Sequence, residues 1–148
     1  MQRRGLFVLA VSALVAPAAA QGLPRRINHN GGVALRGYDP VAWFANGGPR
    51  RGSPLLMAQH GGVAWHFASE QNLEAFRASA DGFLPAFGGF CAFGVSRGYK
   101  VDIDPEAWHI RDGRLFLNYD RGVQRQWQRD IPGHIARAEA NWPRLADT

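Results

Sequence analysis

Two parts of the chain alternate between apolar and polar residues with a period of two, which is the pattern of a half-buried β-strand. The first part covers residues 55–67, where Gly61-Gly62 is a turn signal of the two-residue type that joins hairpin strands. The turn sets the register, because each residue before it faces one residue after it. Three cross-strand pairs are predicted on the face that turns to the core: His60 with Val63, Ala58 with Trp65, and Leu56 with Phe67.

The opposite face of this hairpin is more polar, and on it Met57 lies directly across from His66. A second hairpin is predicted over residues 108–117, with Asp112-Gly113 at its turn. In its first strand His109 alternates with two apolar residues, so the imidazole is expected to face solvent.

Helix-start signals lie between and after the hairpins. Three residues have the position and the side chain of an N-cap: Asp39, Ser69 and Asp120. A short helix is predicted over residues 90–96, and a last helix over residues 134–142 is expected to stop before Pro143. Because the hairpins are interspersed with helices without a βαβ rhythm, the predicted fold class is α+β. We expect a small single domain in which two β-hairpins form an antiparallel sheet packed against short helices.

The N-terminus has the three parts of a secretory signal peptide. Arg3 and Arg4 form the positive region, residues 6–16 are mainly apolar, and residues 18–20 are alanines before a predicted cleavage point. The paired arginines also resemble a twin-arginine export signal. The sequence therefore leaves two export routes open, the twin-arginine route and the ordinary Sec route. The protein is therefore predicted to be periplasmic or secreted, and not to span the membrane after cleavage.

These features divide the chain into four segments: a signal peptide at 1–20, an N-terminal arm at 21–36, a folded domain at 37–143 and a C-terminal tail at 144–148. The arm is polar and rich in glycine as far as residue 32, so it is expected to be a loosely packed tether. The single cysteine excludes an intramolecular disulfide, and the five tryptophans and nine phenylalanines must supply the core.

The charge pattern bears on the class of partner. The formal net charge of +5 includes the two arginines of the signal peptide, and the other basic residues are scattered along the chain. A nucleic-acid-binding protein concentrates its basic residues on one surface. Nucleic acid is therefore not expected as a partner.

Several short motifs follow one another between residues 37 and 143: Gly37-Tyr38-Asp39-Pro40-Val41-Ala42, Trp65-His66-Phe67-Ala68-Ser69, Gly88-Gly89-Phe90-Cys91-Ala92, Ile103-Asp104-Pro105-Glu106-Ala107, Leu117-Asn118-Tyr119 and Asp130-Ile131-Pro132-Gly133. In this order they resemble the YHS domain family, in its exported single-domain form. The resemblance implies a small α+β unit that is similar to cysteine-rich metal-handling modules. The chain departs from the family in having Trp65 where the name implies tyrosine, and Ala68 where some members have a second cysteine.

The functional interpretation depends on Cys91, which lies among three phenylalanines and several glycines. The thiol is either an inert core residue, a metal ligand or a nucleophile. A metal site would combine Cys91 with His66, with Met57 or His60 as further ligands. Thiolate, imidazole and thioether groups suit copper or another transition metal.

Two other groups of polar residues are weaker candidates. Asp102, Asp104 and Glu106 alternate in an extended segment, which suits a hard cation, but Asp104 before a proline is also a turn cap. His29 lies in the arm, and His134 begins the last predicted helix and is expected to be exposed.

Three functions stay open on this basis. The first is an exported YHS-type binding module whose partner is a transition-metal ion or a protein. The second is a thiol-dependent enzyme or redox partner that uses Cys91. The third is a structural or interaction domain without chemistry.

Overall fold

The computed structural model describes residues 8, 10–12 and 22–148, so most of the predicted signal peptide lies outside the described residues. No helix in the described part is both long enough and apolar enough to cross a bilayer.

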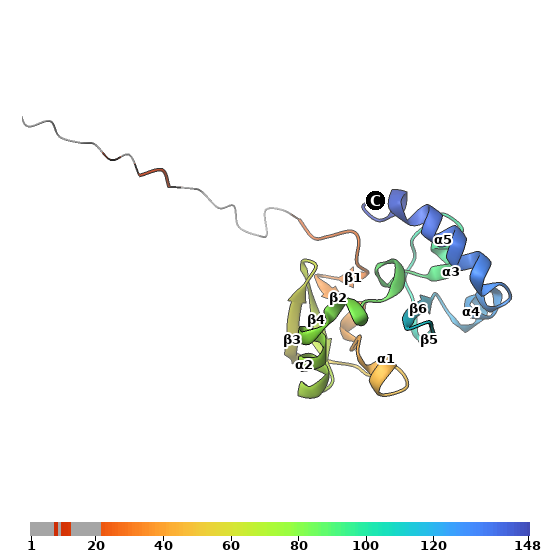
Figure 1. Ribbon diagram of the computed structural model, residues 1–148, viewed down its shortest axis with the longest axis horizontal. Coiled ribbons are helices and arrows are strands. Elements are labelled where there is room, and N and C mark those ends of the chain that lie inside the picture. The colour runs from red at the N-terminus through yellow and green to blue at the C-terminus, as the bar shows by residue number, and fades with distance from the viewer. Residues whose placement is uncertain (1–7, 9, 13–21) are drawn as a thin grey trace, which may run out of the picture.

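The described part of the chain forms two β-sheets and five α-helices (Figure 1). One sheet has four strands in the order β1-β2-β4-β3, and the other consists of β5 and β6. The strands are β1 (His29–Asn30), β2 (Val33–Ala34), β3 (Ser53–His60), β4 (Val63–Phe67), β5 (Asp104–Arg111) and β6 (Arg114–Asn118). The helices are α1 (Ala42–Ala45), α2 (Glu70–Ala78), α3 (Ala92–Ser96), α4 (Arg121–Gln128) and α5 (Ile131–Leu145).

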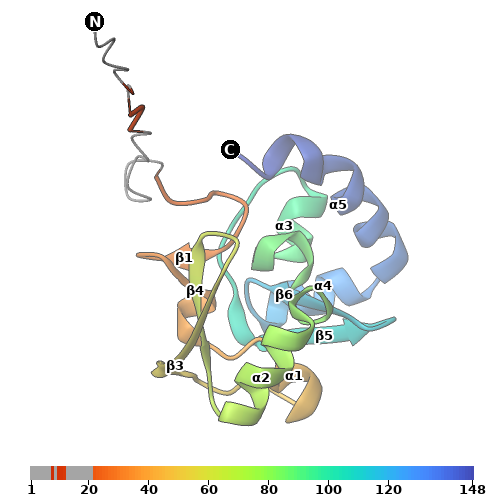
Figure 2. The ribbon, with the colours of Figure 1, turned by 60° about the vertical axis from the view of Figure 1, so that its left-hand side comes forward.

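This arrangement confirms the α+β class and both hairpins. It also corrects the expected single antiparallel sheet, because the hairpins belong to separate sheets and β2 runs parallel to β4. The four-stranded sheet packs with α1 and α2 on one side of the molecule, and the β5–β6 hairpin lies with α3, α4 and α5 on the other (Figures 1 and 2).

The register of the β3–β4 hairpin follows its glycine turn for the four residues nearest that turn. As predicted, His60 pairs with Val63, Ala58 pairs with Trp65, and Met57 lies opposite His66. The predicted pairing of Leu56 with Phe67 is wrong, because a bulge between Ser53 and Met57 moves the partner of Phe67 to Ser53.

The N-caps of α2 and α4 are confirmed. The backbone N–H of Asn72 donates to Ser69 Oγ at 3.1 Å, and that of Val123 donates to Asp120 Oδ1 at 2.7 Å. These bonds satisfy N–H groups that the first turn of a helix leaves free.

Asp39 is not the N-cap of α1, a position that Val41 occupies without a side-chain bond. Its carboxylate is instead fully buried and accepts four hydrogen bonds. Oδ1 accepts from the backbone N–H of Val41 (2.8 Å) and Ala42 (3.3 Å), and Oδ2 accepts from the N–H of Ala68 and from Asn72 Nδ2, both at 2.8 Å. Asp39 therefore joins the start of α1 to the β4–α2 connection.

The last helix is longer than predicted at both ends. It begins after Asp130, whose Oδ1 accepts the N–H of Gly133 at 3.1 Å, and Pro132 fits its first turn because no N–H is needed there. It continues through Pro143 to Leu145, which is buried against the second core cluster. Burial of the final turn therefore outweighs the hydrogen bond that Pro143 removes.

The segment predicted as a loose arm is packed from about Ile27 onwards, which corrects that expectation. Asn28 is nearly buried, and its backbone N–H donates to the carbonyl of Gly88 at 2.8 Å. Its carbonyl accepts from the N–H of Leu35 at 2.9 Å, and Leu35 itself is buried in the core. Gly31 and Gly32 form the turn between β1 and β2, so these two glycines do not indicate flexibility.

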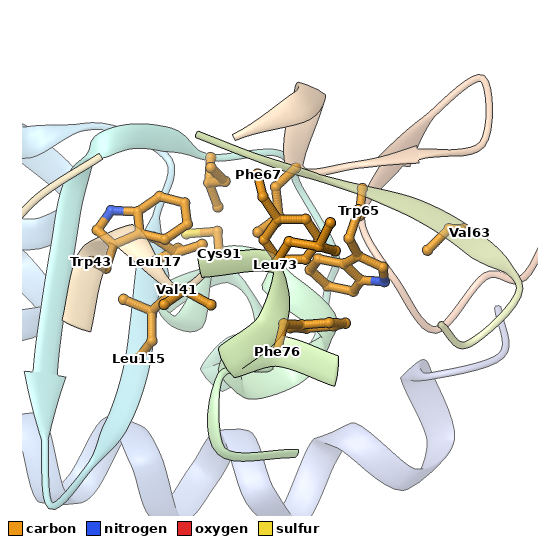
Figure 3. Packing of buried hydrophobic residues seen from close by; sticks show 13 residues of the cluster. Val41, Trp43, Val63, Trp65, Phe67, Leu73, Phe76, Cys91, Leu115 and Leu117 are labelled. Atoms are coloured by element: carbon orange, nitrogen blue, oxygen red, sulfur yellow. The ribbon is translucent and has the colours of Figure 1, made fainter. Parts of the chain in front are cut away.

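Two clusters of buried side chains form the core. The larger one lies between the four-stranded sheet and the β5–β6 hairpin, and it includes Trp43, Trp65, Phe67 and Cys91 (Figure 3). The smaller one lies under α5 and includes Phe87, Phe116 and Trp127. Along β6, Leu115 and Leu117 enter the first cluster and Phe116 enters the second, so both faces of this hairpin are covered.

Candidate functional site

A left-handed turn brings Cys91 to its position. Phe87, Gly88 and Gly89 all have positive φ, at 54°, 64° and 82°, inside the 3-10 turn Ala86–Gly89. The chain then extends, and the N–H of Cys91 donates to the carbonyl of Val101 at 3.0 Å before α3 begins.

Close packing explains the two glycines of this turn. A Cβ on Gly88 would overlap the backbone carbonyl oxygen of Arg26, and a Cβ on Gly89 would lie 2.5 Å from Leu35 Cδ2. Asn28 fastens the turn from the other side, since its Nδ2 donates to the carbonyl of Gly89 at 3.1 Å. The glycines noted in the sequence therefore serve the approach of residues 26–28 as well as the turn.

Cys91 is the N-cap residue of α3 and is 1% exposed, and its sulfur is the capping atom. It accepts hydrogen bonds from the backbone N–H of Gly94 at 3.4 Å and of Tyr119 at 3.2 Å. The thiol in turn donates to Asn118 Oδ1 at 3.6 Å. In Figure 3 the sulfur lies within the apolar cluster, close to Leu117. The thiol is thus buried and takes part in three hydrogen bonds.

Asn118 is a residue of this site that sequence reasoning did not select. Its Oδ1 also accepts the N–H of Phe93 at 3.1 Å, which fixes the orientation of the amide. Its Nδ2 is completely buried and has no hydrogen-bond partner within the described residues. A buried amide donor without a partner is unusual. The only signal in the sequence was the Leu117-Asn118-Tyr119 motif within the family resemblance.

Burial raises the pKa of the Cys91 thiol above its ordinary value. The N–H groups of Gly94 and Tyr119 act in the opposite direction, because they stabilise a thiolate, but they do not offset the loss of water. Donation to Asn118 also requires the protonated thiol. Near neutral pH the site therefore holds a thiol rather than a thiolate.

A pocket of about 320 Å³ lies against Cys91. Its walls are aromatic and aliphatic, and two of them are tyrosines with 48% and 55% of their surface exposed, Tyr99 and Tyr119. The complete lining is Cys91, Phe93, Tyr99, Val101, Tyr119 and Val123. Because the walls offer few polar groups, the pocket suits a small and mainly apolar molecule.

The structure does not bring the four predicted metal ligands together. His66 alternates along β4 with Trp65 and Phe67, whose side chains are in the core cluster that contains Cys91. Its imidazole is therefore on the other face of the sheet, beside Gly37, and Met57 lies opposite it. His60 is at the hairpin tip, where its ring meets the edge of Phe76 at 5.6 Å between centroids.

The other histidines also have structural surroundings. His134 is buried rather than exposed, because α5 begins earlier than predicted, and its Nδ1 lies 3.0 Å from Ser96 Oγ. His109 faces the ring of Trp127 at 5.5 Å rather than solvent, because α4 covers that face of the hairpin. This burial lowers the pKa of His109. His29 Nε2 lies 2.9 Å from the carbonyl of Pro24.

The three alternating carboxylates have separate partners. Asp102 accepts from Asn28 Nδ2 at 2.9 Å and forms an ion pair with Arg36 at 2.6 Å. Burial acts to raise the pKa of Asp102, but the hydrogen bonds from Asn28 and the Ile103 N–H, together with Arg36, outweigh it and lower the pKa. Asp104 Oδ1 accepts the N–H of Glu106 at 2.9 Å, which is the expected turn cap, although Glu106 continues into strand β5.

Within the part of the chain that the structure describes, no three His, Cys, Asp or Glu side chains are grouped to hold a metal ion. The donor set expected for copper therefore does not fit one site here. Comparison of the chain with models of protein families, with curated proteins and with solved structures finds no match. The YHS resemblance stays a prediction, and the function must be argued from the geometry.

The raised pKa of Cys91 predicts slow alkylation of the folded protein. Iodoacetamide attacks the thiolate, so at pH 8 the folded protein should react at least about 100-fold more slowly than the same chain in denaturant. The ratio should narrow as the pH rises, because the folded thiol ionises at a higher pH than the unfolded one. Reaction followed by mass spectrometry measures both rates, and equal rates at pH 8 would contradict the assignment.

Proposed function

We propose that this protein is a binding module whose ligand occupies the pocket over Cys91. The ligand class is a small, mainly apolar molecule, aromatic or short-chain aliphatic, that contacts the faces of Tyr99 and Tyr119. The observation on which the proposal rests is a buried, hydrogen-bonded thiol at the base of an apolar pocket with half-exposed tyrosine walls.

The neighbouring polar atoms support a binding role for the thiol. A neutral thiol is a weak donor and a polarizable apolar surface, so it contributes contact area to an apolar ligand. Asn118 accepts the hydrogen bond of the thiol but is not part of the pocket lining, so it orients the thiol and does not itself contact the ligand. Such a site binds and orients a molecule without requiring a reactive group.

Binding is tested with phenol and indole as probes, followed by amide NMR spectra of the folded protein. We expect saturable shifts at Phe93, Tyr99 and Tyr119, with a Kd in about the millimolar range that is usual for fragments of this size. If neither probe shifts these amides, the proposed pocket is wrong.

Two matched variants locate the binding. Val123→Trp should fill the pocket and abolish the shifts, because Val123 forms one of its walls. Leu55→Trp adds the same ring at an exposed position outside the pocket and should leave the affinity unchanged. If both variants lost probe binding equally, the loss would come from the added tryptophan ring in general and would not locate the binding in this pocket.

A thiol-dependent enzyme or redox partner is the second candidate. The N–H groups directed at Cys91 Sγ favour it, whereas the raised pKa of the thiol opposes it. Rapid alkylation of the folded protein at neutral pH would favour this candidate over the binding module. Export, the YHS family and binding of copper or another metal stay predictions.

A further inference from the structure

A second groove, of about 440 Å³, lies on the face of the four-stranded sheet that turns away from Cys91. The turn after β2, the start of β3 and His66 of β4 form its walls. Two arginines and one histidine line it, and no acidic residue does: Arg36, Arg51 and His66 are the ionisable members of its lining.

The backbone at one wall is strained. Leu35 and Arg36 have positive φ, at 51° and 54°, and Gly37 continues the left-handed turn at 82°. For residues with a Cβ this conformation is strained, and such strain is concentrated at functional sites. The turn directs Arg36 to Asp102 and to the carbonyl of Ile103, at 2.6 and 2.9 Å from its Nη2. Arg36 is therefore held in place with its charge balanced.

Arg51 supplies the unbalanced charge. Its Nη1 donates to the carbonyl of Arg36 at 3.2 Å, its Nη2 is 3.5 Å from the Tyr38 hydroxyl, and its guanidinium lies 4.8 Å from the Tyr38 ring centre. No carboxylate forms an ion pair with it among the described residues, and residues 1–21 contain no Asp or Glu. A guanidinium has five N–H donors, so most of those of Arg51 stay free.

Two glycines bring the backbone close to the third polar group. A Cβ on Gly37 would lie 3.2 Å from His66 Nδ1, and a Cβ on Gly52 would overlap the backbone of His66. The N–H of Gly52 donates to the carbonyl of Gly37 at 2.7 Å, which ties these two segments together. The imidazole is thus part of the groove lining and is packed against the turn that carries Arg36.

We propose that this groove binds a small oxyanion, the phosphate or carboxylate group of a small molecule. Arg51 contributes the charge and a planar pair of donors that matches two oxygens of such a group. His66 contributes a ring N–H, and Arg36 positions Arg51 through its carbonyl. The site is separate from the pocket over Cys91 and is proposed independently of the function assigned to that pocket.

The test is an amide NMR titration with inorganic phosphate at constant ionic strength, with succinate in a parallel arm. We expect saturable shifts at Gly37, Gly52 and His66, and the anion that binds more tightly identifies the group. Arg51→Gln should weaken binding at least about tenfold, the effect of losing a charged hydrogen bond.

Arg50→Gln is the matched control, because it removes the same charge from the adjacent residue, which is outside the groove and whose Nη1 donates to the carbonyl of Pro49. It should change the affinity less than about twofold, since a screened surface charge contributes little. Equal weakening in the two variants, or no saturable shift with either anion, would overturn the proposal. Val123→Trp should leave phosphate binding unchanged, so failure at one site is distinguishable from failure at the other.

Discussion

Gly88→Ala is expected to lower the free energy of unfolding by at least about 3 kcal/mol, a large part of the stability of a small domain. The added Cβ would overlap the carbonyl oxygen of Arg26 and lie 2.9 Å from its carbonyl carbon. Backbone cannot move aside as a side chain does, so the bond from Asn28 to the carbonyl of Gly88 should also be lost. Denaturant unfolding measures the change.

Gly47→Ala is the control for this variant. Gly47 has nearly the same positive φ, 69° against 64°, but nothing lies within 4 Å of a Cβ built on it. The free energy of unfolding should fall by only about 1 kcal/mol in Gly47→Ala, which is the cost of the left-handed conformation itself. A loss as small for Gly88→Ala would contradict the packing of residues 26–28 against the turn. The alkylation rate of Cys91 should rise in Gly88→Ala, because this turn holds the sulfur in the core.

Asp39→Ala is expected to lower the free energy of unfolding by about 3–5 kcal/mol. The substitution removes four hydrogen bonds and leaves three donors without an acceptor: the N–H groups of Val41 and Ala68 and one N–H of the Asn72 side-chain amide. The N–H of Ala42 keeps its second acceptor, the backbone carbonyl of residue 39 at 3.3 Å. None of these donors reaches water easily, because the carboxylate between them is completely buried. Chemical denaturation of the purified variant gives the change.

Two comparisons make this prediction specific. Asp39→Asn keeps the shape but turns one acceptor into a donor that faces other donors, so it should also be destabilising, by at least about 1–2 kcal/mol. Asp104→Ala removes an exposed turn cap with one bond and should cost less than about 1 kcal/mol. Similar losses for Asp39→Ala and Asp104→Ala would show that the four buried bonds contribute little.

Strand β4 lies between the core around Cys91 and the proposed oxyanion groove. Trp65 and Phe67 of β4 pack in the core cluster with Cys91, whereas His66 between them lines the oxyanion groove. Cys91 and His66, which the sequence combined into one metal site, are thus on opposite sides of this strand, because neighbouring residues of a β-strand face opposite ways. Cys91→Ser should therefore leave phosphate binding intact.

Local signals determined the hairpins, the caps of α2 and α4 and the α+β class. Gly61-Gly62 and Asp112-Gly113 fix turns, and Ser69 and Asp120 cap helices, through bonds that span only a few residues. These turns and caps depend only on neighbours along the chain, so they could be predicted from the sequence alone. The bulge after Ser53 and the continuation of α5 past Pro143 depend on packing against distant parts of the chain. The local pattern of the sequence therefore predicted neither of them.

Tertiary structure alone decided the surroundings of Cys91. The sequence showed a thiol among phenylalanines, but Asn118 and Tyr119 come from a hairpin that is more than 20 residues away along the chain. Alternation likewise identified the two faces of β4 and β5, yet α4 covers the face that holds His109. A periodic pattern states which residues share a face, and only the packing of other elements determines whether that face meets protein or water.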